Sequence, residues 1–178
     1  MRYAVAKSGA YLAYVSICGT SKVRNLPIRA IFLIEMKLMK MSRGLRNNNP
    51  GNIRRGNFRY KGEKAKSSDA EFRQFESMEW GYRAMFMLLH TYELKHGCRT
   101  IRQMINRYAP PSENFTEGYI RRVVNATHIL PDEAVSTLNG AVMTTIVSAM
   151  SEVENGVKAD MGAVWRGWKL FIADLTQK

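Results

Sequence analysis

One stretch of the chain, residues 44–55 (GLRNNNPGNIRR), constrains the fold most, because it cannot form a regular helix or strand. Pro50 has no amide donor and disfavours the helical conformation at Asn49, whereas Gly51 permits the positive φ that a tight turn needs. Asparagine side chains also close local hydrogen bonds with the backbone. We therefore predict a turn at this place.

The polar groups of this stretch indicate a binding role. Four asparagines lie within six residues, with two arginines on each side. Amides and guanidinium groups suit the hydroxyl and acetamido groups of oligosaccharides, and also carboxylates and phosphates. The alternative is a polar loop whose side chains satisfy only its own backbone.

The formal net charge of +12 is concentrated in the first third of the chain. Residues 1–40 hold seven Lys and Arg against one Glu, residues 41–66 eight against one, and residues 67–178 twelve against thirteen acidic residues. A basic arm and loop thus precede a nearly neutral domain. This pattern suits phosphate-rich partners such as nucleic acid, anionic lipid or the bacterial surface.

The cysteine and histidine pattern predicts neither a metal nor a cofactor. Two cysteines and three histidines show no CxxC or HExxH spacing, so we expect no structural metal and no disulfide framework. The sequence also has no Walker loop, GxGxxG or GxSxG motif, so nucleotide binding and triad hydrolysis have no support.

Residues 1–40 do not resemble a folded domain. Arg2 and Lys7 precede an apolar run, Gly9 to Cys18, that is similar to a short signal-peptide core. No run reaches the roughly 18–20 residues of a membrane-spanning helix, so we predict no transmembrane segment. We predict two parts: residues 1–40, a basic extension that is dispensable, an export signal or an artefact of the reading frame, and residues 41–178, one compact domain.

Helical periodicity predicts that the domain is mainly α. Residues 77–97 place apolar side chains on one face, between Ser77 at the N-cap and Gly97 at the C-terminal end. Three further helices are predicted: one after Thr100, one from Thr116, and one from about residue 133 to residue 153. Asn139-Gly140 could interrupt the last of these, with residues 141–153 continuing it. Residues 57–76 are polar and turn-rich, so we expect an irregular or briefly β-like segment there.

A last predicted helix covers about residues 160–175. Trp165 and Trp168 follow its apolar stripe, so we expect both to lie in the core rather than to form sugar platforms.

Carboxylates close to polar and aromatic loop residues are the remaining candidates for chemistry. Glycoside cleavage needs a carboxylic acid with a raised pKa, and burial beside aromatic groups raises it. Glu113 stands between Pro111 and Phe115, although it could equally support the cap of the helix at Thr116. Asp69 precedes Phe72 and could face the same cleft, or remain an ordinary solvated charge.

Several motifs occur at characteristic spacings between residues 42 and 124. They are RGLRNNNPGNIR at 43–54, Asp69, Phe72, Phe75, GYRA at 81–84, TI at 100–101 and YAPPSEN at 108–114. Together they resemble a family of phage and prophage proteins that are described as virion structural proteins or lysozyme-like peptidoglycan hydrolases. The resemblance implies a lysozyme-like helical domain.

A more distant similarity links the order of elements to lytic transglycosylases and glucosaminidases. Residues 48–54 are similar to the Asn-rich turn that follows their catalytic Glu, and residues 113–123 to their Glu-Thr-x-x-Tyr-Val stretch. Those enzymes have Glu-Ser-Gly upstream of the turn, whereas this chain has Glu35-Met36-Lys37. Either the acid has moved to Asp69, Glu71 or Glu113, or the fold persists without the activity.

The leading hypothesis is a phage-associated glycosidase that cleaves β-1,4 links of peptidoglycan, in the virion or at the bacterial periplasm and cell wall. The expected general acid is Glu113 and the expected second carboxylate is Asp69. The residues expected to line the glycan groove are Asn47, Asn48, Asn52, Arg54 and Tyr119. One alternative is a non-catalytic virion structural protein that holds a glycan, protein or nucleic acid. Another is a nucleic-acid binder, which rests on the basic first third alone.

Overall fold

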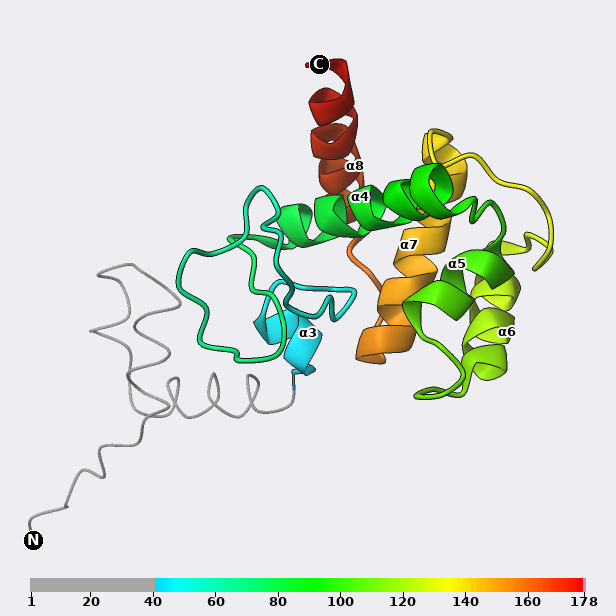
Figure 1. Cartoon of the computed structure of the whole chain (residues 1–178), viewed down its shortest axis with the longest axis horizontal. Coiled ribbons are helices and arrows are strands. Elements are labelled where there is room, and N and C mark those ends of the chain that lie inside the picture. The colour runs from blue at the N-terminus through cyan, green and yellow to red at the C-terminus, as the bar shows by residue number, and fades with distance from the viewer. Residues whose placement is uncertain (1–40, 178) are drawn as a thin grey trace, which may run out of the picture. The chain divides into compact units, whose positions relative to one another are not determined.

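The computed structural model describes residues 41–177, so the predictions on residues 1–40, including Glu35, lie outside the described residues. The described part is mainly α-helical, as predicted (Figure 1). Its helices, in chain order, are α3 (Arg43–Arg46), α4 (Met78–His96), α5 (Ile101–Tyr108), α6 (Thr116–Thr127), α7 (Gly140–Asn155) and α8 (Met161–Thr176). None of these is long and apolar enough to cross a membrane.

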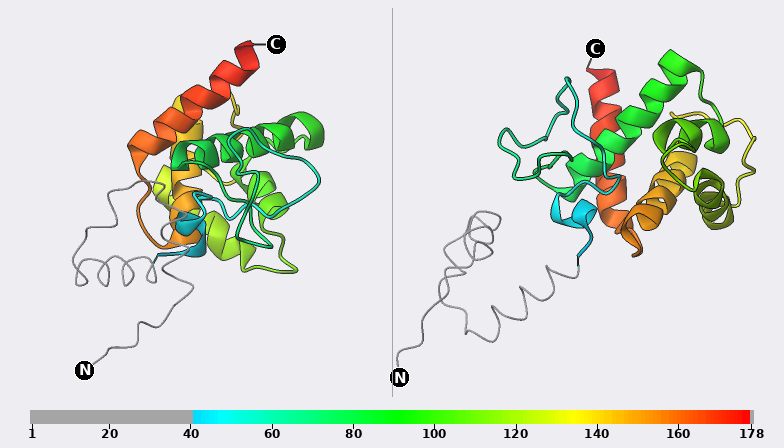
Figure 2. Two further views of the ribbon diagram at one scale, coloured as in Figure 1. Left: turned by 90° about the vertical axis from the view of Figure 1, so that its left-hand side faces the viewer. Right: turned by 60° about the horizontal axis from the view of Figure 1, so that its bottom comes forward.

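Helix α4 is the centre of the packing. It packs along α8 more extensively than any other pair of helices in this region, and it also contacts α5 and α7 (Figures 1 and 2). Gly167 of α8 permits this close approach, because a Cβ there would lie 2.7 Å from Cβ of Tyr82 and 2.8 Å from the carbonyl oxygen of Glu79. On the other side of the molecule α7 packs on α6, and α6 packs on α5.

The core is continuous from the polar segment to the last helix. Its largest fully buried side chains are Phe75, Tyr82, Met85, Phe86, Leu89, Ile101, Met104, Ile105, Met143, Ile146, Met150 and Phe171. Aromatic contacts join α4 to α8, with the rings of Phe86 and Trp168 5.1 Å apart. Trp168 is buried as expected, but Trp165 is 45% exposed, so its predicted core position is wrong.

The ends of α4 agree with the sequence, since Ser77 precedes it and Gly97 ends it with a left-handed φ of 64°. Two other starts differ. Thr116 is the first residue of α6 and not its cap, because its hydroxyl donates to the carbonyl of Ala109 at 2.6 Å. Helix α7 begins at Gly140, at the interruption that Asn139-Gly140 suggested, and not near residue 133. Asn139 accepts a hydrogen bond from the amide of Val142 and caps the helix.

Residues 57–76 form turns and isolated bridges, as expected for an irregular or β-like segment. Antiparallel bridges join Arg54 to Phe72 and Glu63 to Phe75. They bring the segment back beside the Asn-rich turn, so these two loops form one layer over the start of α4 (Figure 2).

Candidate functional site

The Asn-rich turn is folded by its own asparagines. Asn49 is fully buried, donates to the carbonyl oxygens of Ile53 and Arg73 at 3.0 Å each, and accepts from the amide of Ile53. Asn48 and Asn52 have φ values of 50° and 46°, a conformation that asparagine tolerates better than most residues. The predicted turn is therefore confirmed, but its positive φ values fall on Asn48 and Asn52 and not on Gly51 as predicted. Gly51 is needed for space instead, since a Cβ there would lie 2.7 Å from the hydroxyl of Tyr108.

Two asparagines that were predicted to bind a ligand form hydrogen bonds within the protein instead. Asn47 is buried, and it donates to Asp69 at 2.7 Å while accepting from Gln74 at 2.8 Å. Asn48 donates to the carbonyl oxygens of Phe75 and Glu76. Neither residue lines the groove described below, so this arrangement favours a structural role for both.

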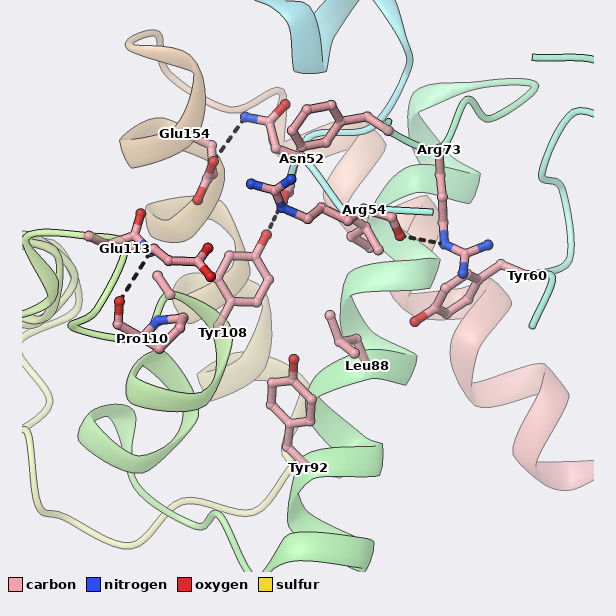
Figure 3. A pocket seen from close by; sticks show the side chains of 15 residues that line it. Asn52, Arg54, Tyr60, Arg73, Leu88, Tyr92, Tyr108, Pro110, Glu113 and Glu154 are labelled. Carbon is pink, nitrogen blue, oxygen red and sulfur yellow. Dashed lines mark hydrogen bonds between the residues drawn. The ribbon is translucent and has the colours of Figure 1, made fainter. Parts of the chain in front are cut away.

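A groove of about 550 Å³ runs between the turn, α4, the α5–α6 loop and the end of α7. The walls of the groove are formed by both polar and aromatic side chains. The lining residues are Gly51, Asn52, Ile53, Arg54, Tyr60, Phe72, Arg73, Leu88, Tyr92, Tyr108, Ala109, Pro110, Glu113, Asn114 and Glu154. In Figure 3, Glu113 and Glu154 lie towards one end of this groove, and Tyr60 and Arg73 lie towards the other.

Glu154, in the last turn of α7, is the carboxylate that the groove holds most firmly. Its Oε2 accepts from Nδ2 of Asn52 at 2.9 Å, and its Oε1 accepts from the hydroxyl of Tyr119 at 3.0 Å. Burial raises the pKa of the Glu154 carboxyl above its usual value, although the two hydrogen bonds act in the opposite direction. This carboxyl is thus suited to hold a proton that a solvated glutamate would release.

The supports of Glu154 come from distant parts of the chain. Asn155 donates to the carbonyl oxygen of Pro50 at 2.8 Å and accepts from the hydroxyl of Ser42 at 2.6 Å, which ties the end of α7 to the turn. Tyr119 is buried on α6 beneath the groove. The end of α7 is therefore held by both the turn and α6.

Asn52 has one buried atom without a partner. Its Oδ1 makes no hydrogen bond within the described residues, while its Nδ2 is bound to Glu154. The amide group is thus oriented so that its NH2 donates to the carboxylate of Glu154. This orientation is consistent with a role of Asn52 in positioning Glu154.

Glu113 lines the same groove but is exposed. Its amide donates to the carbonyl oxygen of Pro110 at 3.0 Å, which sets the turn before α6. The described residues make no hydrogen bond to its carboxylate, so this group can contact a ligand at the mouth of the groove.

Asp69 lies away from the groove, in a dense set of hydrogen bonds. Its carboxylate accepts two hydrogen bonds from the guanidinium of Arg43 and one from the side chain of Asn47. It also accepts one from each of the backbone amides of Glu71 and Phe72. The Arg43 guanidinium, followed by these amide donors, holds the pKa of the Asp69 carboxyl well below its usual range. These contacts favour a structural role over the predicted role as second carboxylate.

Cations and aromatic rings form the opposite wall. The guanidinium of Arg73 lies 4.9 Å from the ring centre of Tyr60, and that of Arg54 lies 5.4 Å from the ring centre of Phe72. Arg73 is buried and paired with Glu63 at 2.5 Å, whereas Arg54 is exposed. Of the predicted binding residues, the structure thus brings Asn52, Arg54 and Glu113 to the groove, with Tyr119 behind Glu154.

Glu154 is not among the residues predicted to form the site, although the sequence contains a signal for it. Met143, Val147 and Met150 are fully buried on one face of α7, and Glu154 continues this series at the next helical step. A glutamate in line with an apolar stripe is either buried at a site or placed at the frayed end of a helix.

No protein-family model matches the chain. Protein P5 of Pseudoalteromonas phage PM2 is 36% identical to it over 129 residues, which cover 71% of this chain and 79% of that protein. The chain therefore belongs to the same bacteriophage protein family as Protein P5 of phage PM2.

Proposed function

We propose that the protein is a phage virion component that acts at the bacterial wall, and that its groove binds and cleaves glycan strands with Glu154 as the general acid. The observation that carries this proposal is the half-buried Glu154 carboxyl, which is held by Asn52 and Tyr119 and has a raised pKa, at the wall of an open groove. The family relationship to a phage protein supports the phage context.

The groove has the chemistry that glycan binding requires. Tyr60, Tyr92 and Tyr108 line it with aromatic surface, and Asn52 and Arg54 add hydrogen-bond donors. Sugars combine apolar ring faces with hydroxyl and acetamido groups, so they need both kinds of surface.

In the proposed reaction the protonated Glu154 donates its proton to the glycosidic oxygen as the bond to the leaving sugar breaks. Asn52 and Tyr119 fix the orientation of the carboxyl. They also donate to the carboxylate that remains after proton transfer. Glu113 replaces Asp69 as the candidate second carboxylate, because it lines the same groove.

The proposal also accounts for the sequence similarity to lytic transglycosylases and glucosaminidases. In those enzymes the acid comes from a helix that precedes the Asn-rich turn. Here α7, which follows the turn by about a hundred residues, provides a glutamate that is hydrogen-bonded to the turn through Asn52. The proposed acid thus keeps its place beside the turn while coming from another part of the sequence.

The test is digestion of purified peptidoglycan by the full chain, with mass spectrometry of the soluble fragments. We expect Glu154→Gln to lower the rate by about 10²–10⁴-fold, the usual contribution of a general acid. Glu152→Gln, two residues earlier on α7, is the matched control and should retain the rate. Fragment ends with a reducing sugar or an anhydro-sugar distinguish hydrolysis from transglycosylation. A folded Glu154→Gln variant with full activity would disprove the assignment of the acid.

A second candidate function is a virion structural protein that binds glycan without cutting it. Membership in a phage protein family supports this candidate independently of any acid. Peptidoglycan binding by the folded wild type, without release of fragments at any pH between 4 and 9, would favour it over the glycosidase.

A further inference from the structure

The segment 54–66, beside the groove, carries positive charge that the fold does not neutralise. It contains Arg54, Arg55, Arg59, Lys61, Lys64 and Lys66. Within residues 41–177, Lys61 alone among these six forms an ion pair, with Asp174 at 2.6 Å. The nearby carboxylate of Glu63 is occupied by Arg73. Five cations therefore remain without an acidic partner in the described part of the chain.

Two of these cations are positioned by neutral groups. Arg55 donates to the carbonyl oxygen of Asp69 at 3.3 Å, and Arg59 donates to that of Glu63 at 2.7 Å. A carbonyl acceptor orients a guanidinium group but leaves its charge and its other donors available. The fold thus holds these side chains in place while their charge stays open to an anion.

Three of the five unpaired cations, Arg55, Arg59 and Lys64, line a second hollow of about 200 Å³, which we call the basic hollow. Its lining residues are Arg55, Gly56, Asn57, Phe58, Arg59, Glu63, Lys64, Ala65 and Arg73. Arg73 also lines the groove, so the two cavities share one wall. Phe58 is 56% exposed, with the guanidinium of Arg73 5.6 Å from its ring centre. The basic hollow therefore combines open positive charge with an apolar surface.

We propose that the basic hollow binds the carboxylates of peptides attached to the glycan, so that the protein selects a peptide-bearing strand over a neutral one. This inference rests on the proposed function, because the groove must hold the sugar chain. A glycan in the groove brings its side groups to the shared wall at Arg73. The guanidinium groups of Arg55 and Arg59 match carboxylates in geometry and charge, and Phe58 offers a surface for the apolar part of a peptide.

The experiment measures binding by calorimetry to two probes, using the full chain with Glu154→Gln so that the probes stay intact. One probe is a neutral β-1,4-linked N-acetylglucosamine hexamer, and the other is a peptide-bearing oligosaccharide from peptidoglycan. The variant Arg55→Gln/Arg59→Gln/Lys64→Gln removes three charges from the basic hollow. Arg121→Gln/Arg122→Gln/Lys158→Gln removes three exposed charges elsewhere and is the matched control.

We expect the basic-hollow variant to lose about tenfold in affinity for the peptide-bearing probe, since each exposed charge pair contributes modestly. Its affinity for the neutral hexamer should not change, and the control variant should bind both probes like its parent. Amidation of the peptide carboxylates should weaken binding to the parent chain by a similar factor. This last measurement needs no substitution in the basic hollow, so it does not depend on the folding of the basic-hollow variant.

Equal affinity of the parent chain for both probes would overturn the inference and leave the proposed groove function intact. Absence of binding to either probe would overturn both. Tighter binding of duplex DNA than of the peptide-bearing probe, lost in the basic-hollow variant, would replace the inference with phosphate recognition.

Discussion

The hydroxyl of Tyr119 donates a hydrogen bond of 3.0 Å to Oε1 of Glu154, across 35 residues of sequence. This bond joins the first turn of α6 to the last turn of α7, and the residue that receives it is half-buried. Burial and hydrogen bonding act in opposite directions on the pKa of Glu154, and burial is the larger effect. Each can therefore be tested separately.

Glu154→Gln should stabilise the protein at neutral pH. Because the pKa of Glu154 is raised in the folded state, the folded protein holds a proton over a pH range in which the unfolded chain has released it. The free energy of unfolding therefore decreases as the pH rises from the unfolded pKa towards the folded pKa. The amide removes this penalty, and the hydroxyl of Tyr119 can rotate to accept from it. Thermal unfolding from pH 4 to pH 8 should show equal stability at low pH and a growing advantage of the variant above it. A gain of about 1 kcal/mol would raise Tm by roughly 3 °C.

Glu152→Gln controls for the loss of one negative charge on α7 and should not show this pH-dependent gain. If Glu154→Gln were destabilised most at pH 8, the carboxylate would be the favoured form in the fold. The role of Glu154 as a proton donor would then have no basis.

Tyr119→Phe should raise the pKa of Glu154 further, because it removes a donor that favours the ionised carboxylate. If Glu154 is the general acid, the alkaline limb of the pH–rate profile for peptidoglycan cleavage should move to higher pH. The carboxyl carbon of Glu154 should show the same shift in an NMR titration, independently of activity. Stability should fall by about 0.5–1.5 kcal/mol.

Tyr108→Phe is the control for this shift, because Tyr108 donates to the carbonyl oxygen of Gly51 and not to Glu154. An equal change in the titration of Glu154 in both variants would mean that the Tyr119 bond has no special influence on the carboxyl.

Asp69→Asn should destabilise the fold by about 2–3 kcal/mol. The amide carries no negative charge for the bidentate interaction with Arg43, and one of the two carboxylate oxygens that accept from Arg43 and Asn47 becomes an NH2 group. The pKa of Asp69 is depressed in the folded state, so its stabilisation is present above the unfolded value near 3.8 and decreases as pH falls below it. Urea unfolding at pH 7 and pH 3 should therefore show a smaller difference from the wild type at pH 3.

Glu71→Gln removes a single bond to the same arginine from a side chain that is 61% exposed, and should cost at most about 1 kcal/mol. If Asp69→Asn were as stable as Glu71→Gln but abolished peptidoglycan cleavage, Asp69 would belong to the reaction after all.

Gly81→Ala should separate the Asn-rich turn from α4. An added Cβ would overlap the carbonyl oxygen of Asn48 and lie 2.5 Å from Cδ of Pro50. We expect a loss of about 2 kcal/mol or more, as for other overpacked sites, together with weaker glycan binding because Asn52 would shift.

Gly162→Ala is the comparison on α8, where the nearest side-chain atoms lie 3.1 Å or more from the added Cβ. Helix propensity favours alanine there by up to about 1 kcal/mol. Similar unfolding midpoints for the two variants would show that the turn can move away from α4 without cost.

Much of the local structure follows from short-range chemistry. Pro50 restricts the backbone of the turn directly, and Asn48 and Asn52 adopt its left-handed φ values. The apolar period of α4 and its end at Gly97 depend on neighbours within one or two turns. Residues 133–139 stay outside α7, although a helix from residue 133 was predicted, because Glu93 of α4 accepts hydrogen bonds from Thr137 and so fixes this loop from another helix.

The sequence by itself determined a mainly helical domain with a tight asparagine turn, and it indicated Asn52, Arg54 and Glu113 as groove candidates. Only the tertiary structure decided the surroundings of each carboxylate. Asp69 and Glu154 are both acidic residues with polar neighbours in the sequence. In the folded protein Asp69 accepts hydrogen bonds from a guanidinium and several amides, which lower its pKa. Glu154 accepts hydrogen bonds from only two neutral side chains, and desolvation raises its pKa. A pKa depends on burial and on groups that are distant along the chain, and these are set only when α6, α7 and the turn pack together.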